Sequence, residues 1–103
     1  MEDALNREVE LLKDLDHENI VRYLGFEITD TTLNLFLEYV SGGSVTSLVS
    51  RVGKLEEDLT RWIITQVLCG LEYLHERYII HRDIKGANSM CRHSAILSFV
   101  AHF

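Results

Sequence analysis

The octet His81-Arg82-Asp83-Ile84-Lys85-Gly86-Ala87-Asn88 is the most informative segment of this 103-residue sequence. It places a carboxylate, a lysine and a carboxamide close together along the chain. A carboxylate can accept a proton, a lysine can neutralise developing negative charge, and an amide oxygen suits a hard cation. A turn closed by a salt bridge explains the same residues, so the octet alone leaves a catalytic and a structural interpretation open.

Composition and charge limit the classes of protein to which the chain can belong. Hydrophobic residues make up 47% and charged residues 25%, which is typical of one small globular domain. The formal net charge of −6 argues against a nucleic-acid partner. The sequence has no apolar run of the roughly 20 residues that cross a bilayer, so no membrane partner is expected. Two cysteines, Cys69 and Cys91, are too few for a disulfide framework, which favours the reducing cytoplasm.

Hydrophobic spacing predicts a helix followed by a hairpin in the first part of the chain. Residues 2–15 carry apolar side chains three and four positions apart, as an amphipathic helix requires: Leu5, Val9, Leu12 and Leu15. Residues 20–28 are rich in β-forming residues, 29–32 form a turn, and 33–40 form a second strand. We therefore expect an antiparallel hairpin over residues 20–40.

Capping residues predict two further helices. Ser44 can cap the start of a short helix that ends before Gly53, a residue suited to the position after a helix. A long helix is predicted from Glu56 to about Arg77, and Tyr78–Ile80 is expected to be extended. One apolar stripe runs along the long helix: Leu59, Ile63, Val67, Leu71 and Leu74.

The octet resembles the catalytic loop of protein kinases, H-R-D-x-x-x-x-N. Three other segments resemble kinase elements in the family's order: 8–21 resembles helix C and the start of strand four, 35–44 the fifth strand and hinge, and 70–80 the helix before the loop. The sequence of these segments is most similar to that of fungal MAP kinase kinase kinases. The resemblance implies an α+β, partial protein-kinase-like fold made of helix C, a two-stranded hairpin, a hinge, a short helix, a long helix and the catalytic loop.

The same resemblance implies roles for three residues of the octet, Asp83, Lys85 and Asn88. Asp83 would accept or orient the proton of a substrate hydroxyl, and Lys85 would neutralise charge on the γ-phosphoryl group of ATP. Asn88 would be a ligand of Mg²⁺. The implied reaction is transfer of that phosphoryl group to a Ser or Thr hydroxyl of a protein, here a MAP kinase kinase.

Nucleotide-binding positions also follow from the resemblance. The backbone groups of Glu38 and Val40 would face adenine, and Ser44 would approach the ribose. Leu37 matches the gatekeeper position, which is a packing role. Glu8 matches the helix-C glutamate that pairs with a lysine of strand three, although a solvated helix glutamate is the simpler interpretation of Glu8 alone.

The kinase pattern covers about residues 2–88 and then stops. From Ser89 onward the only charged residue is Arg92. We therefore predict a partial kinase domain at 1–88 and a tail outside the family at 89–103. A glycine-rich loop and a catalytic lysine should precede Glu8, and D-F-G should follow Asn88, but none occurs in this sequence. The chain by itself is therefore predicted to be catalytically incomplete.

Two alternatives to an active kinase remain. The chain could be a non-catalytic interaction fragment that docks or self-associates through its strand edges and the apolar side of residues 59–74. It could also be a truncated gene product, which the genomic sequence around codon 88 would reveal.

Overall fold

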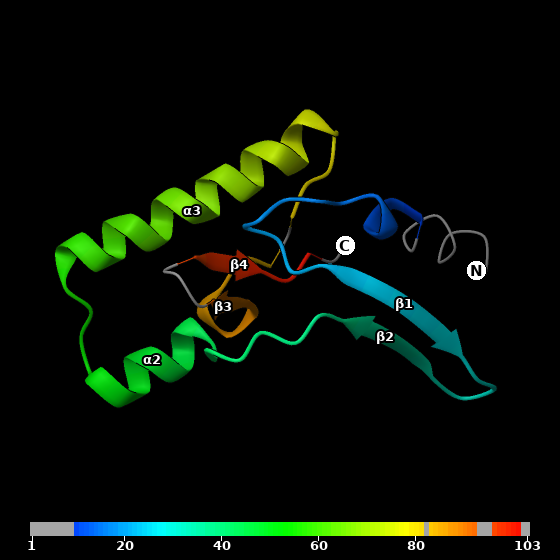
Figure 1. Ribbon diagram of the computed structural model, residues 1–103, viewed down its shortest axis with the longest axis horizontal. Helices are drawn as coiled ribbons and strands as arrows, with labels where there is room; N and C mark the ends of the chain where they lie inside the picture. Colours follow the sequence, from blue (N-terminus) through cyan, green and yellow to red (C-terminus); the bar gives the residue numbers. More distant parts are fainter. Residues whose placement is uncertain (1–9, 82, 93–95, 102–103) are drawn as a thin grey trace.

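The computed structural model describes residues 10–81, 83–92 and 96–101. In chain order its elements are β1 (Tyr23–Ile28), β2 (Leu33–Leu37), α2 (Val45–Val52), α3 (Glu57–Glu76), the 3₁₀ turn η1 (Gly86–Asn88), β3 (Ser89–Cys91) and β4 (Leu97–Phe99). Figure 1 shows the β1–β2 hairpin at one end, α2 and α3 at the other, and β3 and β4 between them. Helices combined with antiparallel hairpins confirm the predicted α+β class.

The end of the predicted first helix is present. Residues 10–13 are helical, and the apolar side chains of Leu12 and Leu15 are buried as their spacing predicts. The rest of that prediction, including Leu5 and Val9, lies outside the described residues.

The predicted hairpin forms with shorter strands than expected. β1 pairs antiparallel with β2 in a register that places Tyr23 opposite Leu37 and Ile28 opposite Leu33. The turn closes through Thr29, whose N–H donates to the carbonyl of Thr32 at 2.8 Å. The predicted extension of the second strand to residue 40 is wrong, because β2 ends at Leu37 and, among the described residues, only the Glu38 N–H continues the pairing, by donating to the Arg22 carbonyl.

The helix α2 has the ends that its capping residues predict. The Ser44 hydroxyl accepts a hydrogen bond from the Ser47 N–H at 3.1 Å. At the other end Gly53 has a φ of 84°, a conformation that glycine adopts without strain, and its N–H donates to Val49. Both boundaries therefore follow from local chemistry.

The helix α3 confirms the strongest helix prediction, but its apolar stripe is only partly buried. Ile63 and Val67 pack against Leu97 of β4, and Leu74 is fully buried. Leu59 is 36% exposed, since it lies one turn before the part of the helix that β4 covers. Leu59 therefore lies at the edge of the buried part of the stripe.

Tyr78, two residues after the end of α3, has a left-handed conformation with a φ of 61°. Its N–H donates to the His75 carbonyl, and the Ile79 N–H donates to the Leu74 carbonyl at 2.9 Å. The chain therefore wraps over the helix end instead of extending from Tyr78 to Ile80 as predicted. This wrap places Ile79 in the core.

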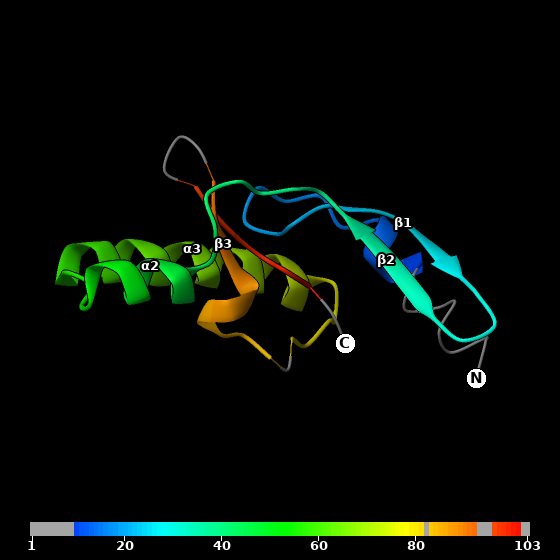
Figure 2. The ribbon, with the colours of Figure 1, turned by 90° about the horizontal axis from the view of Figure 1, so that it is seen from below.

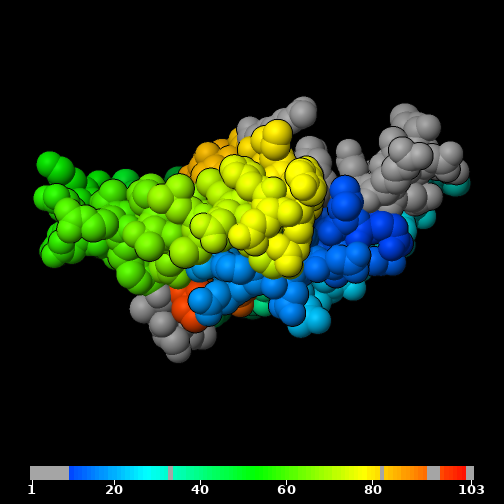
Figure 3. Space-filling model, turned by 90° about the horizontal axis from the view of Figure 1, so that it is seen from above, coloured from blue at the N-terminus to red at the C-terminus, as the bar shows by residue number. Residues whose placement is uncertain are grey.

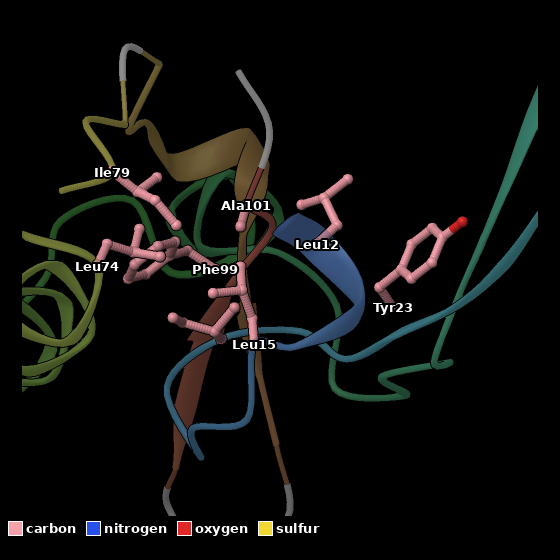
Figure 4. Packing of buried hydrophobic residues seen from close by; sticks show 8 residues of the cluster. Leu12, Leu15, Tyr23, Leu74, Ile79, Phe99 and Ala101 are labelled. Atoms are coloured by element: carbon pink, nitrogen blue, oxygen red, sulfur yellow. The ribbon is translucent and has the colours of Figure 1, made fainter. Parts of the chain in front are cut away.

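Residues 89–101 complete the core. Phe99 and Leu97 of β4 have no exposed surface, and the Phe99 ring lies among Leu74, Ile79 and Leu15, as Figure 4 shows. β4 also joins the first part of the chain, because the Phe99 N–H donates to the Asn19 carbonyl at 2.9 Å. The change of composition near residue 88 is therefore not a break in packing. The assignment of 89–103 to a tail outside the family stays a prediction.

The end of α3 lies beside residues 10–20, as the space-filling view in Figure 3 shows. The Tyr73 hydroxyl accepts a hydrogen bond from the Asp16 N–H at 2.8 Å, and the rings of His17 and Tyr73 are 5.0 Å apart. Within the described ranges, none of the helices has the length and apolar character needed to cross a membrane.

Candidate active site

The three residues predicted to be catalytic lie together. The Lys85 ammonium is 3.4 Å from the Asp83 carboxylate, and the Asn88 amide nitrogen is 3.4 Å from the same oxygen. The Asn88 amide also donates to the Asp83 carbonyl at 3.2 Å. The side chains of Lys85 and Asp83 are 55% and 45% exposed, so their ion pair adds little stability and both groups remain within reach of a substrate.

His81 fixes the backbone that carries Asp83. Its Nδ1 accepts a hydrogen bond from the Asp83 N–H at 3.0 Å, which assigns the ring proton of the neutral imidazole to Nε2. Nε2 lies 2.7 Å from the Val100 carbonyl and donates to it. The ring also meets Phe99 edge-on at 5.4 Å. His81 thus joins the loop to β4 and to the residue after it.

The loop is seated on two neighbouring segments. The Val100 N–H donates to the Asn88 carbonyl at 2.8 Å, and the Ser89 hydroxyl donates to the Lys85 carbonyl at 3.0 Å. Gly86 lies against the start of α2, where an added Cβ would come within 2.8 Å of the Thr46 hydroxyl oxygen. These contacts hold the loop from both sides.

The predicted hinge lines a cavity of about 220 Å³. Its lining residues come from the hinge, from β3 and from the segments beside them: Val21, Leu37, Glu38, Tyr39, Val40, Met90 and Val100. Two of the predicted nucleotide-binding residues, Glu38 and Val40, are thereby brought together. Typical ligand pockets measure roughly 300–1,000 Å³, so this cavity is smaller than a typical ligand pocket.

The Glu38 side chain forms an ion pair with Arg92. The Arg92 guanidinium binds its carboxylate through two nitrogens, and the Arg22 N–H donates to it at 2.6 Å. The hydrogen bonds from Arg92, opposed in part by burial, hold the pKa of Glu38 below its ordinary value.

The remaining predicted site residues are not brought into the hinge cavity by the described part of the structure. Ser44 bridges to Met90 of β3, but its hydroxyl caps α2 and is not part of the hinge cavity as far as the described residues define it. Glu8 lies outside the residues that the structure describes.

Asn88 can offer one neutral oxygen to a cation, but the described residues contain no group of three His, Cys, Asp or Glu side chains able to hold a metal ion. Mg²⁺ in nucleotide sites is usually held by one or two carboxylates together with phosphate oxygens. The described residues therefore do not make a complete magnesium site, and the assignment of Asn88 as a ligand stays a prediction.

Sequence reasoning missed two residues of this site, Arg92 and Val100. Both lie after residue 88, where hydrophobic periodicity gave no prediction of structure. A signal was nevertheless present, because Arg92 is the only charged residue from Ser89 onward.

A hinge with a cavity beside it, together with an Asp-Lys-Asn loop, is the arrangement found in the protein kinase class. A model of the protein kinase domain matches residues 1–98, and the chain belongs to that family.

Similar proteins indicate which branch of the protein kinase family the chain resembles. The mitogen-activated protein kinase kinase kinase MST11 of Pyricularia oryzae is 58% identical over 88 residues, which are 85% of this chain and 10% of that protein. The MAP kinase kinase kinase mkh1 of Schizosaccharomyces pombe is 54% identical over 86 residues, 84% of this chain and 8% of that protein. The chain thus spans about a tenth of the length of these curated relatives.

A solved structure agrees with the fold. Rad53 in complex with AMP-PNP matches with a TM-score of 0.91 and 32% sequence identity, over 98% of this chain and 28% of that one. The sequence-based identification of a Ser/Thr kinase domain resembling fungal MAP kinase kinase kinases is therefore confirmed.

Proposed function

We propose that this chain provides the hinge and catalytic-loop portion of an ATP-dependent Ser/Thr protein kinase that phosphorylates a MAP kinase kinase. The observation that carries the proposal is the convergence of Asp83, Lys85 and Asn88, with 3.4 Å from the Asp83 carboxylate to both other side chains. The relatives MST11 and mkh1 are named as MAP kinase kinase kinases, which supports the choice of a MAP kinase kinase as substrate.

The chemistry of the loop is proton acceptance and charge neutralisation. The Asp83 carboxylate accepts the proton of a Ser or Thr hydroxyl as its oxygen attacks the γ-phosphoryl group of ATP. Lys85 neutralises charge that builds on the transferred group. Asn88 restrains the Asp83 carboxylate by its amide hydrogen bond, so that the oxygen facing the hydroxyl keeps one orientation.

Adenine binding is proposed for the cavity beside the hinge. The apolar side chains of Val21, Met90 and Val100 supply faces on which a flat ring can pack, and the hinge backbone supplies hydrogen-bonding groups. The AMP-PNP in the related Rad53 structure supports this assignment.

The binding half of this proposal is tested by titrating the isotope-labelled 103-residue chain with ADP and following its amide resonances. Shifts that centre on residues 37–40, 90 and 100 are expected. Met90→Glu should weaken them, whereas Ile64→Glu on exposed α3 surface should not. Shifts spread evenly over the surface would contradict the assignment.

A polypeptide of only these 103 residues is proposed not to turn over ATP. Its sequence contains no D-F-G and no glycine-rich loop before Glu8. Each preorganised group of this kind typically lowers a barrier by about 3–4 kcal/mol, so their joint loss leaves negligible transfer. Phosphorylation of a protein substrate by the purified chain, abolished by Asp83→Ala, would contradict this expectation.

A cytoplasmic location is part of the same proposal. Cys69 and Cys91 form no disulfide, as in proteins of reducing compartments. A fluorescent fusion expressed in fungal cells would test it, and a signal confined to organelles would count against it.

Self-association is a second candidate function, favoured by exposed apolar side chains on two elements. Leu24 and Phe36 of the hairpin are 63% and 49% exposed, and Ile64 and Leu68 of α3 are 51% and 59% exposed. Analytical ultracentrifugation should then show concentration-dependent dimers that Leu68→Glu disrupts. A monomer at all concentrations would exclude this function.

A further inference from the structure

Arg92 lies between β3 and β4 and contacts two other parts of the chain. Its Nη1 donates to Glu38 Oε2 at 3.1 Å, and its Nη2 binds Glu38 Oε1. Its Nε donates to the Ser98 hydroxyl at 2.5 Å, and that hydroxyl donates to the Glu18 carbonyl. All three nitrogens of the Arg92 guanidinium group thus form hydrogen bonds.

The pair that Arg92 forms with Glu38 has the geometry of a strong contact. The two side chains are each 26% exposed, so solvent screens them less than it screens a surface pair. A fork-to-carboxylate pair fixes direction as well as distance, which a lysine cannot do.

Glu38 is also held by its own backbone. Its N–H donates to the Arg22 carbonyl at 2.9 Å, and its carboxylate accepts the Arg22 N–H. Only one backbone group of Glu38, its carbonyl, takes no part in these contacts. Residues 38–40 lie beyond the end of β2, and the bond from the Glu38 N–H to Arg22 is a backbone contact between them and the segment before β1.

We propose that Arg92 is a positioning residue for the nucleotide cavity: by clamping the Glu38 side chain behind the hinge, it fixes the direction in which the hinge backbone faces adenine. The inference rests on the proposed nucleotide-binding function. It assigns a role to a segment whose sequence lies beyond the kinase motifs, because the only charged residue after Ser89 reaches the hinge.

The test compares five variants of the 103-residue chain, four with a single substitution and one that combines Arg92→Met with Glu38→Gln. Arg92→Met removes the fork, Arg92→Lys keeps the charge without it, and Glu38→Gln weakens the acceptor. Arg61→Met is the control, since Arg61 forms a surface pair with Glu57 on α3 and is 69% exposed. Amide hydrogen exchange at residues 38–40 and the dissociation constant for ADP are measured for each.

Loss of the clamp should raise amide exchange at residues 38–40 roughly tenfold, as expected when a charged hydrogen bond is lost. Exchange along α3 should not change. The dissociation constant for ADP should rise about three- to tenfold, the range typical of indirect coupling. Arg92→Met combined with Glu38→Gln should add nothing further, whereas Arg61→Met should match the wild type.

Unchanged hinge exchange in Arg92→Met and Arg92→Lys would overturn the proposal, as would a rise that α3 shares equally. Should Arg92→Met fail to fold, Arg92→Lys decides alone. If the wild-type chain binds no ADP, the nucleotide-binding function fails, but hinge exchange still tests the clamp independently.

Discussion

The Phe99 ring lies so close to Gly70 that a Cβ added at Gly70 would come within 2.4 Å of Phe99 Cε1. Phe99 has no exposed surface, so it has nowhere to move. Gly70→Ala should therefore lower the free energy of unfolding by about 1–3 kcal/mol, despite the better helix propensity of alanine. Urea unfolding followed by circular dichroism measures the loss.

Gly25→Ala provides the control for this prediction. The nearest atom to a Cβ at Gly25 is a ring carbon of Phe36 at 4.0 Å, which is an ordinary contact. Gly25→Ala should therefore change the free energy of unfolding by no more than about 0.5 kcal/mol. Equal losses for the two variants would show that close packing at Gly70 is not the cause.

Tyr78 is expected to be a site of stored backbone strain. It has a φ of 61°, and its side chain is 96% exposed, so packing does not compensate. Tyr78→Gly should raise the free energy of unfolding by up to about 1 kcal/mol, since glycine adopts this conformation at no steric cost. Tyr78→Ala removes the same ring but keeps a Cβ, so it should bring no gain. Stabilisation by both variants would point to the ring instead.

Stability in acid should depend on Glu38. Its pKa is held below the ordinary value of 4.5 by Arg92, so the carboxylate favours the folded state above that pH. This contribution is lost as the pH falls through the lowered pKa of the folded state. Between about pH 6 and pH 3, Glu38→Gln should lose less stability than the wild type.

Urea midpoints measured across that pH range provide the test. Glu57→Gln is the control, because Glu57 lies in a surface pair with an 86% exposed side chain. The wild type and Glu57→Gln should decline in parallel. A Glu38→Gln profile that follows them would remove the basis for this effect.

In the neutral form of His81, the single ring N–H proton should be on Nε2, because Nδ1 accepts a hydrogen bond from the Asp83 N–H. Two-bond proton–nitrogen correlation spectra distinguish the tautomers directly. His75, which is exposed on α3, serves as the internal reference for a ring without this pair of contacts. Protonation of His81 at Nδ1 in the neutral ring would contradict the hydrogen bond to Asp83.

Local features made α2 and α3 predictable. Ser44 and Gly53 mark the ends of α2 by hydrogen bonds within a few residues, and α3 differs from its predicted bounds by only the terminal positions. The Asp83, Lys85 and Asn88 cluster also follows from one continuous motif.

Long-range features were not predictable in the same way. The pattern Leu37-Glu38-Tyr39-Val40 continues the alternation of a strand, yet a strand also needs a neighbour, and the alternation cannot reveal one. Arg92 meets Glu38 across 54 positions of sequence, a separation that no periodicity records. The hairpin of β3 and β4 was missed because β4 does not alternate between buried and exposed residues. All three of its residues are buried, so it lacks the usual signal of a strand with one face in the core.

The pairing of β4 with the first part of the chain sets an order on folding during synthesis. Ser98 bonds to Glu18, 80 positions earlier, and the Val21 N–H donates to Phe99. Figure 2 shows β4 passing through the middle of the molecule. A ribosome must therefore release residue 101 before Leu12, Leu15 and Leu74 can be sealed from water. Until then these side chains are exposed to chaperones, and nascent chains arrested before residue 97 should be captured more strongly than those arrested well beyond it.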